Sequence, residues 1–334
     1  MKRAFITGTA GFIGFHLAKR LLDDGWQVMG LDGMTPYYSP KLKEVRLANL
    51  KAYNQFQFYR GMVEDTGLAT RLVAEFKPDV IVHLAAQAGV RYSIDEPRSY
   101  VSANLTGAHE ILEAARAHRP AHLMMASTSS VYGANTNMPN AEHHRAVHPM
   151  SFYAATKIAN EAMAHSYAHL FDVPTTMFRF FTVYGTWGRP DMALFKFTKA
   201  VLNGDPIDVY NYGDMHRDFT YVSDLVEGIV RLAAVPPGKE PVGASDNLSP
   251  VAPFRVVNIG NGAPYQLNDF ISAIEKASGQ TAQRNLMPMQ PGDVSATWAD
   301  TSLIEALVGK LPRTSIEDGV RNFVDWYRGW NAPD

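Results

Sequence analysis

The sequence predicts an α/β protein built on a doubly wound parallel sheet, and three observations carry that prediction. Short apolar runs alternate with longer amphipathic segments through the first half of the chain. A glycine-rich turn directly follows the first apolar run, and an acidic residue ends the second. Strands separated by helices imply right-handed crossovers, which place the strands parallel in one sheet with helices on both faces.

The apolar runs are expected to form strands covered on both faces, because they are short and mostly apolar. These strands cover residues 3–8, 27–32, 56–61, 79–85, 122–128 and 175–181. Helices are expected where apolar residues recur with helical spacing. In the first half they cover residues 12–24, 39–51, 66–76, 98–118 and 151–170, and in the second half residues 191–203, 222–234, 267–278 and 315–329.

Composition restricts the class of function. A chain of 334 residues with 46% hydrophobic content suffices for one large domain and a smaller lobe. Because 31 basic and 33 acidic residues leave a net charge of −2, no strong field favours nucleic acid or an anionic membrane, and small molecules are the expected partners. The chain has no cysteine, which excludes disulfides and thiolate chemistry and fits the cytoplasm.

Membrane and metal chemistry are not expected. The first residues contain too few apolar positions before glycine interrupts them to form a signal peptide or an anchor. No run of about 18 apolar residues follows. The adjacent His143 and His144 stand in a polar stretch without a third ligand at the usual spacing. We therefore expect surface histidines there and no metal.

The glycine-rich turn "TGTAGFIG" predicts a dinucleotide site. Gly8, Gly11 and Gly14 let the backbone approach a pyrophosphate, and the helix that follows offers free N–H groups. Their spacing differs from the common G-x-G-x-x-G fingerprint, but the order of strand, glycines, helix and acid is the expected one. Asp32 ends the second strand, where a carboxylate binds ribose hydroxyls and repels a 2′-phosphate. With no basic residue until Lys41, NAD is expected rather than NADP.

The sequence pattern changes after about residue 182, where the strand candidates become shorter and polar residues interrupt them. We expect residues 1–182 to form the NAD-binding domain, to which later segments return, and residues 183–334 to form mainly a smaller substrate-binding lobe. Residues 235–254 are rich in Pro, Gly and Ser, which is typical of a surface loop.

The segment "SFYAATK" at residues 151–157 places a phenol and an amine on one helix face. Ser151 is a suitable N-cap, and Tyr153 and Lys157 then lie one turn apart. An ammonium near a phenol favours the phenolate, so we expect Lys157 to lower the pKa of Tyr153. Such pairs also occur on solvated helices, and the spacing alone leaves that alternative open.

Several motifs together resemble the extended short-chain dehydrogenase/reductase family, and specifically its nucleotide-sugar epimerases. They are "TGTAGFIG", "HLAAQAGVRYS", "STSSVYG", "YAATK" and "RFFTVYGTWGRPDM", and the resemblance runs from Lys2 to the "FVDWYR" segment near the end. The segments "DMALFKFTKAVLNGDPIDVYNYGDMHRDFTYV" and "MPMQPGDVSATWADTS" are most similar to UDP-glucuronate 4-epimerases. The resemblance implies a Rossmann-type domain, bound NAD, a UDP-sugar substrate and a homodimer formed by the helices at 98–118 and 151–170.

The resemblance also implies residue roles. Tyr153 would be the general base and acid, Lys157 would bind the nicotinamide ribose, and the Thr128 hydroxyl would bond the sugar O4. Asn104 would shape the active-site helix. The expected cofactor-binding residues are Gly8, Gly11, Phe12, Ile13, Gly14, Asp32, Val63, Leu84, Ala85, Ala86, Tyr153 and Lys157. Met62 stands where the family usually has an aspartate that contacts adenine, so either Asp65 substitutes or one hydrogen bond is lost.

The expected substrate-binding residues are mostly hydroxyl-bearing or cationic. Hydroxyls suit a sugar carboxylate, and guanidinium groups suit a diphosphate or a uronate. These residues are Thr128, Ser129, Ser130, Thr182, Arg189, Arg217 and Asp293, of which Asp293 would close the nucleotide pocket. An ion pair of Arg217 with Asp218 or Asp224 is the competing interpretation. Arg91 is left unassigned.

The leading hypothesis is NAD-dependent epimerisation at C4 of UDP-glucuronate through a 4-keto intermediate. The pair Ser129 and Ser130 disfavours two sibling reactions, because related dehydratases carry Asp-Glu there and related decarboxylases carry a glutamate at the position of Ser130. Alternatives are a 4-epimerase of UDP-glucose or UDP-N-acetylglucosamine, a UDP-glucuronate decarboxylase, and an NAD-binding regulatory protein without turnover.

Overall fold

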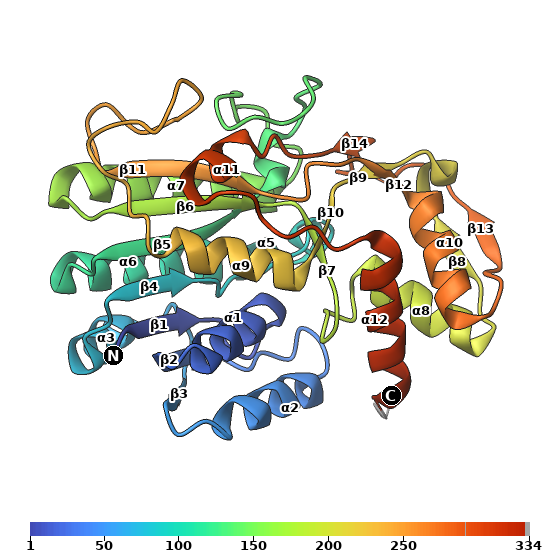
Figure 1. The fold of residues 1–334 in the computed structure, drawn as a ribbon, viewed down its shortest axis with the longest axis horizontal. Coiled ribbons are helices and arrows are strands. Elements are labelled where there is room, and N and C mark those ends of the chain that lie inside the picture. The colour runs from blue at the N-terminus through green and yellow to red at the C-terminus, as the bar shows by residue number, and fades with distance from the viewer. Residues whose placement is uncertain (291, 331–334) are drawn as a thin grey trace.

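A seven-stranded, wholly parallel sheet forms the centre of the computed structural model, which describes residues 1–290 and 292–330 (Figure 1). Its strand order is β11-β6-β5-β4-β1-β2-β3. The strands are β1 (Arg3–Thr7), β2 (Gln27–Asp32), β3 (Phe56–Arg60), β4 (Val80–His83), β5 (His122–Thr128), β6 (Thr175–Phe180) and β11 (Phe254–Ile259). The predicted doubly wound parallel sheet is confirmed.

The edge strand β11 was not predicted as a strand. It follows the Pro-rich loop and pairs along its whole length with β6. Its apolar pattern is interrupted by Arg255, which is fully buried and forms an ion pair at 2.8 Å with Asp246 of the preceding loop. Because that neutralising partner lies outside the strand, the local pattern gave no sign that a charged residue could be buried there.

Helices cover both faces of the sheet (Figure 1). On one face α1 (Phe12–Asp23), α9 (Val222–Leu232) and α11 (Ser302–Val308) share an apolar core with alternate strand residues, and α2 (Pro40–Lys51) packs beside α1. On the other face lie α3 (Leu68–Phe76), α6 (Gly107–His118) and α7 (Phe152–Phe171). Among the described residues, no helix is long and apolar enough to cross a lipid bilayer.

The helix predicted over residues 98–118 is not one regular α-helix. A short helix α5 (Pro97–Tyr100) continues into a π-helical segment (Val101–Thr106), and only then does α6 begin. The π turn carries Asn104, whose side chain bonds to a loop and to α7. These tertiary bonds explain why helical spacing in the sequence did not reveal the irregularity.

A smaller lobe packs at the carboxyl side of the sheet, on the right in Figure 1. Its helices are α8 (Ala193–Asn203), α10 (Leu267–Ser278) and α12 (Ile316–Gly329), which enclose a core where the Phe219 and Phe270 rings stack at 4.1 Å. Short strand pairs complete it: β7 (Thr182–Tyr184) with β10 (Phe219–Tyr221), β8 (Ile207–Val209) with β13 (Arg284–Leu286), and β9 (His216–Arg217) between β12 (Tyr265–Gln266) and β14 (Ala296–Thr297).

The strand order positions the site. The chain runs outward from β1 through β2 to β3 and then returns to the other side of β1 to form β4. The connections after β1 and β4 therefore leave the sheet in opposite directions, which opens a crevice at the carboxyl ends of these two strands.

Candidate functional site

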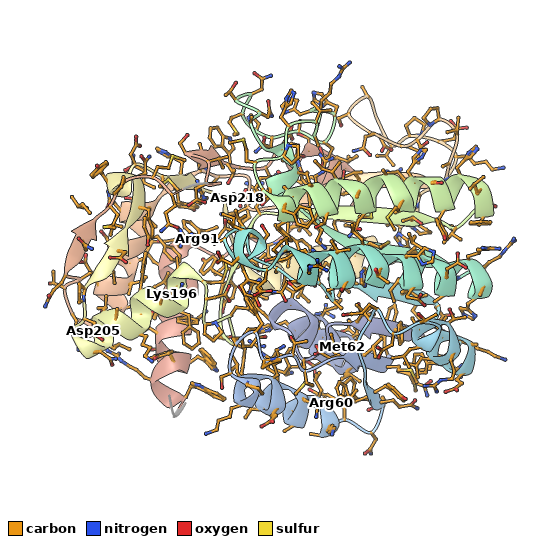
Figure 2. The ribbon with its side chains drawn as sticks, turned by 180° about the vertical axis from the view of Figure 1, so that it is seen from behind. Arg60, Met62, Arg91, Lys196, Asp205 and Asp218 are labelled. Carbon is orange, nitrogen blue, oxygen red and sulfur yellow. The ribbon has the colours of Figure 1, made fainter. Side chains whose placement is uncertain are left out.

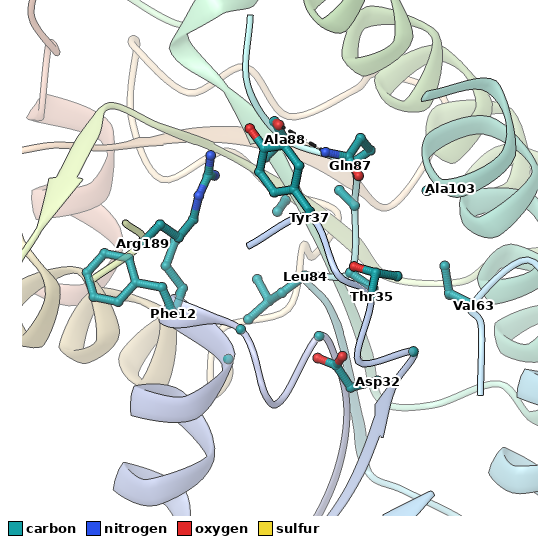
Figure 3. A pocket seen from close by; sticks show the side chains of 18 of the residues that line it. Phe12, Asp32, Thr35, Tyr37, Val63, Leu84, Gln87, Ala88, Ala103 and Arg189 are labelled. Carbon is teal, nitrogen blue, oxygen red and sulfur yellow. Dashed lines mark hydrogen bonds between the residues drawn. The ribbon is translucent and has the colours of Figure 1, made fainter. Parts of the chain in front are cut away.

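A cavity of about 650 Å³, called the main cavity because the predicted cofactor-binding and catalytic residues line it, lies at the carboxyl ends of β1, β2, β4 and β5. Figure 3 shows Asp32 on one side of it and Arg189 on another. The structure brings all predicted cofactor-binding and catalytic residues together around this cavity. They are Gly8, Gly11, Phe12, Ile13, Gly14, Asp32, Val63, Leu84, Ala85, Ala86, Thr128, Tyr153 and Lys157.

The glycine-rich turn lines the cavity with glycine residues, whose backbone no side chain of their own covers. Gly8 has a φ of +75°, and a Cβ there would lie 2.9 Å from the backbone nitrogen of Ala85. A Cβ on Gly14 would overlap the carbonyl oxygen of Gly8, which accepts a hydrogen bond from the Gly11 N–H at 3.0 Å. No side chain of the described residues caps the start of α1. Its first N–H groups can therefore bind an anion such as a pyrophosphate.

Asp32 presents a carboxylate that the backbone holds in place. The N–H groups of Ala10 and Met34 donate to its two oxygens at 3.0 and 2.8 Å. Each oxygen keeps a lone pair for a ribose hydroxyl, so the position fits the predicted role. Lys43 also lines the cavity, bonded through Nζ to the Thr35 carbonyl at 2.8 Å. Burial lowers the pKa of Lys43, while the charge of Asp32 opposes that shift.

Tyr153 and Lys157 both line the main cavity from α7. Ser151 caps the helix as predicted, since its Oγ accepts a backbone N–H of the first turn at 3.1 Å. One turn after Tyr153, the Lys157 Nζ donates to the Ala126 carbonyl at 2.9 Å. Thr128 ends β5 and shares a hydrogen bond with Tyr153. A phenol, an ammonium group and a hydroxyl thus meet at one part of the cavity.

The ionisation of this pair differs from the prediction that Lys157 lowers the pKa of Tyr153. Burial raises the pKa of Tyr153, although the hydrogen bond to Thr128 and the charge of Arg189 oppose the shift. Burial also lowers the pKa of Lys157 to about 8, with Glu161 opposing. The expectation was wrong because both groups are removed from water, and desolvation is the largest influence on the pKa of each.

Asn104 links the π turn to two other walls of the site. Its Oδ1 accepts the N–H of Gln87 at 2.8 Å, and its Nδ2 donates to the Gln87 carbonyl and to the Thr156 Oγ1, each at 3.1 Å. Nearby, the ring of Tyr100 meets the ring of Tyr153 edge to face at 6.0 Å. The loop after β4 and the start of α7 are thereby held against each other.

Five of the predicted substrate residues surround a smaller cavity of about 120 Å³. They are Ser129, Ser130, Thr182, Arg217 and Asp293. The Thr128 Oγ1, on the wall of the main cavity, donates to the Ser130 Oγ, on the wall of the smaller one, at 3.2 Å. A substrate that reached from Thr128 toward these residues would meet hydroxyl groups first and a guanidinium group beyond them.

Arg217 does not pair with Asp218 or Asp224. It donates to the carbonyls of His216, Ser295 and Val294 at 2.6–3.1 Å, and its Nη2 lies 3.9 Å from Asp293. The carboxylates of Asp218 and Asp224 instead accept hydrogen bonds from backbone N–H groups and threonine hydroxyls. The guanidinium is therefore oriented by neutral carbonyls beside the smaller cavity.

Arg189 lies on the wall of the main cavity next to Tyr37 (Figure 3). Its Nε donates to Asp191 at 3.0 Å, and the Tyr37 hydroxyl donates to the same carboxylate at 3.2 Å. Asp191 thus orients Arg189 and partly offsets its charge. An incoming oxyanion would compete with Asp191 for the guanidinium.

Arg91 and Met62 lie in different parts of the molecule (Figure 2). Arg91 faces the smaller lobe, 3.7 Å from Asp293 and over the ring of Tyr210. Met62 lines the main cavity, whereas the Asp65 carboxylate accepts the Met62 N–H at 3.0 Å and is not among the residues that line the cavity. Of the two possibilities left open for the adenine contact, substitution by Asp65 is thus not supported.

Sequence reasoning missed the polar side chains of residues 37–46. Tyr37 and Lys43 line the main cavity, and Arg46 lies fully buried behind it. Arg46 donates to the Ala10 carbonyl at 3.0 Å and to the Trp187 carbonyl at 2.5 Å, and so joins the glycine-rich turn to the loop that carries Arg189. A usable signal was present, because Lys43 and Arg46 occupy the same helix face as buried leucines.

No group of three or more His, Asp or Glu side chains within residues 1–290 and 292–330 is arranged to hold a metal ion. His143 and His144 pack against each other, with ring centroids 4.7 Å apart.

Known proteins resemble the chain over nearly its full length. A relative from Rhizobium meliloti, described as a probable UDP-glucuronate 4-epimerase, is 58% identical over 329 residues, which is 97% of this chain and 96% of the relative. The Staphylococcus aureus protein CapI is 51% identical and covers 97% of this chain and 98% of its own.

Solved structures also resemble the chain over nearly its full length. A UDP-glucuronic acid 4-epimerase from Bacillus cereus, solved with UDP-glucuronic acid and NAD, superposes with a TM-score of 0.88 at 32% identity, over 98% of this chain and 99% of the other. The family model described as GDP-mannose 4,6 dehydratase matches residues 5–323. The chain therefore belongs to this dehydratase-like family of extended short-chain dehydrogenases/reductases.

Proposed function

We propose that the protein is an NAD-dependent UDP-glucuronate 4-epimerase that interconverts UDP-glucuronate and UDP-galacturonate. One observation carries the proposal: Tyr153, Lys157 and Thr128 meet at the main cavity, and a hydrogen bond links Thr128 to Ser130 on the wall of a smaller cavity lined by hydroxyl groups. The named relatives and the Bacillus cereus enzyme support the same activity.

The main cavity fits NAD. The glycine turn would hold the pyrophosphate, and the Asp32 carboxylate would accept the adenosine ribose hydroxyls. Lys157 would donate to the second ribose. When bound, NAD⁺ supplies the acceptor and donor for the C4 hydride of the sugar, as well as a positive charge beside the phenol.

Tyr153 would move the proton of the sugar 4-hydroxyl. In the forward step its phenolate takes that proton while C4 becomes a ketone, and in the return step the phenol gives the proton back. Thr128 bonds Tyr153 and can share a hydrogen bond with O4, which would keep the oxygen in line with the base. After the ketone turns over within the site, the same phenol protonates an alkoxide of opposite configuration.

The hydroxyl groups of the smaller cavity would determine whether the 4-keto intermediate keeps its carboxylate. A 4-keto uronate is a β-keto acid, and it loses CO₂ when its C5–carboxylate bond stands perpendicular to the ketone plane. Ser129, Ser130 and Thr182 would bond the carboxylate and hold it away from that orientation. The proposal therefore assigns two tasks to the site, epimerisation and suppression of decarboxylation.

Replacement of Thr182 by Val is expected to raise the fraction of decarboxylated product at least about tenfold, because one charge-assisted hydrogen bond to the carboxylate is lost. NMR of the UDP-sugar products measures that ratio, and Thr186→Val, at a position that lines neither cavity, is the control. An unchanged ratio in Thr182→Val would show that this hydroxyl does not hold the carboxylate.

A substrate panel tests the function itself. The purified protein is incubated separately with UDP-glucuronate, UDP-glucose and UDP-N-acetylglucosamine, and the products are resolved by NMR. We expect C4 inversion of UDP-glucuronate at least about 100-fold faster than that of the other two, since charged hydrogen bonds discriminate strongly. Equal turnover of all three would contradict the carboxylate site, and binding of NAD without any turnover would favour a regulatory protein.

We further propose that the protein acts as a cytoplasmic homodimer. Exposed apolar side chains on the π turn and α7, namely Val101, Phe152 and Leu170, would be covered by a second copy. The lack of cysteine supports the cytoplasm. A mass in solution of twice 37.0 kDa is expected from light scattering, and a monomer at micromolar concentration would contradict the dimer.

A further inference from the structure

Glu161 continues the line of functional residues along α7. It follows Tyr153 by eight positions and Lys157 by four, so the three side chains lie on neighbouring turns of one face. The Glu161 side chain is 12% exposed, and that of its ion-pair partner Arg179 on β6 is 5% exposed. Burial of a carboxylate is costly unless it is paired and hydrogen-bonded, so this one is expected to have a structural or functional role.

Three hydrogen bonds orient the carboxylate. The Arg179 Nε and Nη2 donate to its two oxygens at 2.9 and 2.7 Å, which is the bidentate arrangement. The Ser127 hydroxyl donates to Oε1 at 2.5 Å. Glu161 therefore connects α7 with both β5 and β6.

The bond to Ser127 reaches the catalytic end of β5. Ser127 stands between Ala126, whose carbonyl accepts the Lys157 ammonium at 2.9 Å, and Thr128, which bonds Tyr153. A shift of Ser127 would move both of these neighbours, because they are adjacent in one extended strand. A single carboxylate thus fixes the backbone partner of the lysine and the hydroxyl partner of the tyrosine.

The charge of Glu161 acts in the same place. The titratable groups near the Lys157 ammonium are Tyr153 and Glu161 on α7 and His83 on β4, and Arg179 on β6 pairs with Glu161. Burial lowers the pKa of His83 to about 3, so His83 is neutral. In the part of the chain that the structure describes, Glu161 is the acid in this group, and it opposes the effect of burial on Lys157.

We propose that Glu161 is a positioning residue of this site, which holds the end of β5 through Ser127 and keeps the Lys157 ammonium charged. The inference rests on the proposed function, in which the charged lysine binds the cofactor ribose. It adds a third member to the tyrosine and lysine pair, one that touches neither substrate nor cofactor.

The test is the pH dependence of the Glu161→Gln holoenzyme. Without the negative charge Lys157 loses its proton at lower pH, so the alkaline limb of the kcat profile is expected to shift down by about one pH unit. NMR titration of ¹³Cε-labelled lysine, with the Lys157 signal identified by its loss in Lys157→Arg, is expected to show the same shift. This second readout needs no turnover, so it tests the inference even if the proposed epimerase activity fails.

Two further variants separate positioning from simple stability. Glu161→Gln leaves Arg179 buried and unpaired, which destabilises the fold, whereas the double variant Glu161→Gln/Arg179→Met removes both charges. We expect the double variant to regain thermal stability but to keep the shifted alkaline limb. Ser127→Ala keeps the charge, and it should lower kcat severalfold without moving that limb. An unshifted profile and an unshifted Lys157 signal in a folded Glu161→Gln protein overturn the proposal.

Discussion

Replacement of Tyr153 by Phe is expected to lower kcat for the epimerisation of UDP-glucuronate by about 1,000-fold or more. General acid–base catalysis by one positioned group typically contributes 10²–10⁴-fold, and this phenol is the proposed group for both proton transfers. The ring would still meet Tyr100 edge to face, so the shape of the cavity should be kept. Initial rates followed by NMR, together with the NAD content of the protein, measure the effect.

Tyr167→Phe is the matched control for that variant. Tyr167 lies on the same helix α7, but its hydroxyl donates to Glu113 at 2.6 Å and does not line the main cavity. Its removal is expected to change kcat less than about twofold. An undiminished rate in Tyr153→Phe, with NAD still bound, would assign the proton transfer to another group.

Replacement of Gly14 by Ala is expected to weaken NAD binding strongly. The added methyl group would overlap the carbonyl oxygen of Gly8 and come within 2.7 Å of its carbonyl carbon. The overlap is with backbone, so the turn itself must move, which costs about 3 kcal/mol and corresponds to a loss of roughly 100-fold in affinity. Isothermal titration of the NAD-depleted protein with NAD measures the change.

Gly243→Ala provides the control, because a Cβ at Gly243 would meet no heavy atom within 4 Å. This variant should bind NAD like the parent protein and should unfold at the same temperature. If Gly14→Ala also bound NAD normally, the glycine-rich turn would not be the pyrophosphate site, and the assignment of the main cavity would fail.

Much of the fold could be predicted because its signals are local. The six predicted strands appear within two residues of their expected ends, since each is a short apolar run bounded by polar or turn residues. The start of α7 is equally local, because Ser151 both ends the loop and caps the helix. The edge strand β11 and the π turn were missed, because the partners that explain Arg255 and Asn104 lie elsewhere in the chain.

The candidate site, like the fold, could be predicted where its signals are local and not where they depend on distant residues. Gly8, Asp32 and Tyr153 follow from short motifs, and the structure places all three around one cavity. What local spacing did not reveal is the electrostatics: burial raises the pKa of Tyr153, and the charge of Asp32 at the end of β2 raises the pKa of Lys43 on α2 against the effect of burial. Solvent exclusion and cross-chain neighbours determine such effects, and neither is a property of a short stretch of sequence.

The buried guanidinium of Arg46 bears on how this enzyme could be re-engineered. It donates hydrogen bonds to the carbonyls of residue 10 and of residues 187 and 188. A chimera that joined the first half of one enzyme to the second half of a related one would separate these two sets of acceptors. A graft that imported a foreign second half with a differently shaped loop would remove the acceptors of the Arg46 Nη2 and leave a buried cation only partly hydrogen-bonded. Recombination of specificities in this fold should therefore exchange α2 and the segment around Trp187 together.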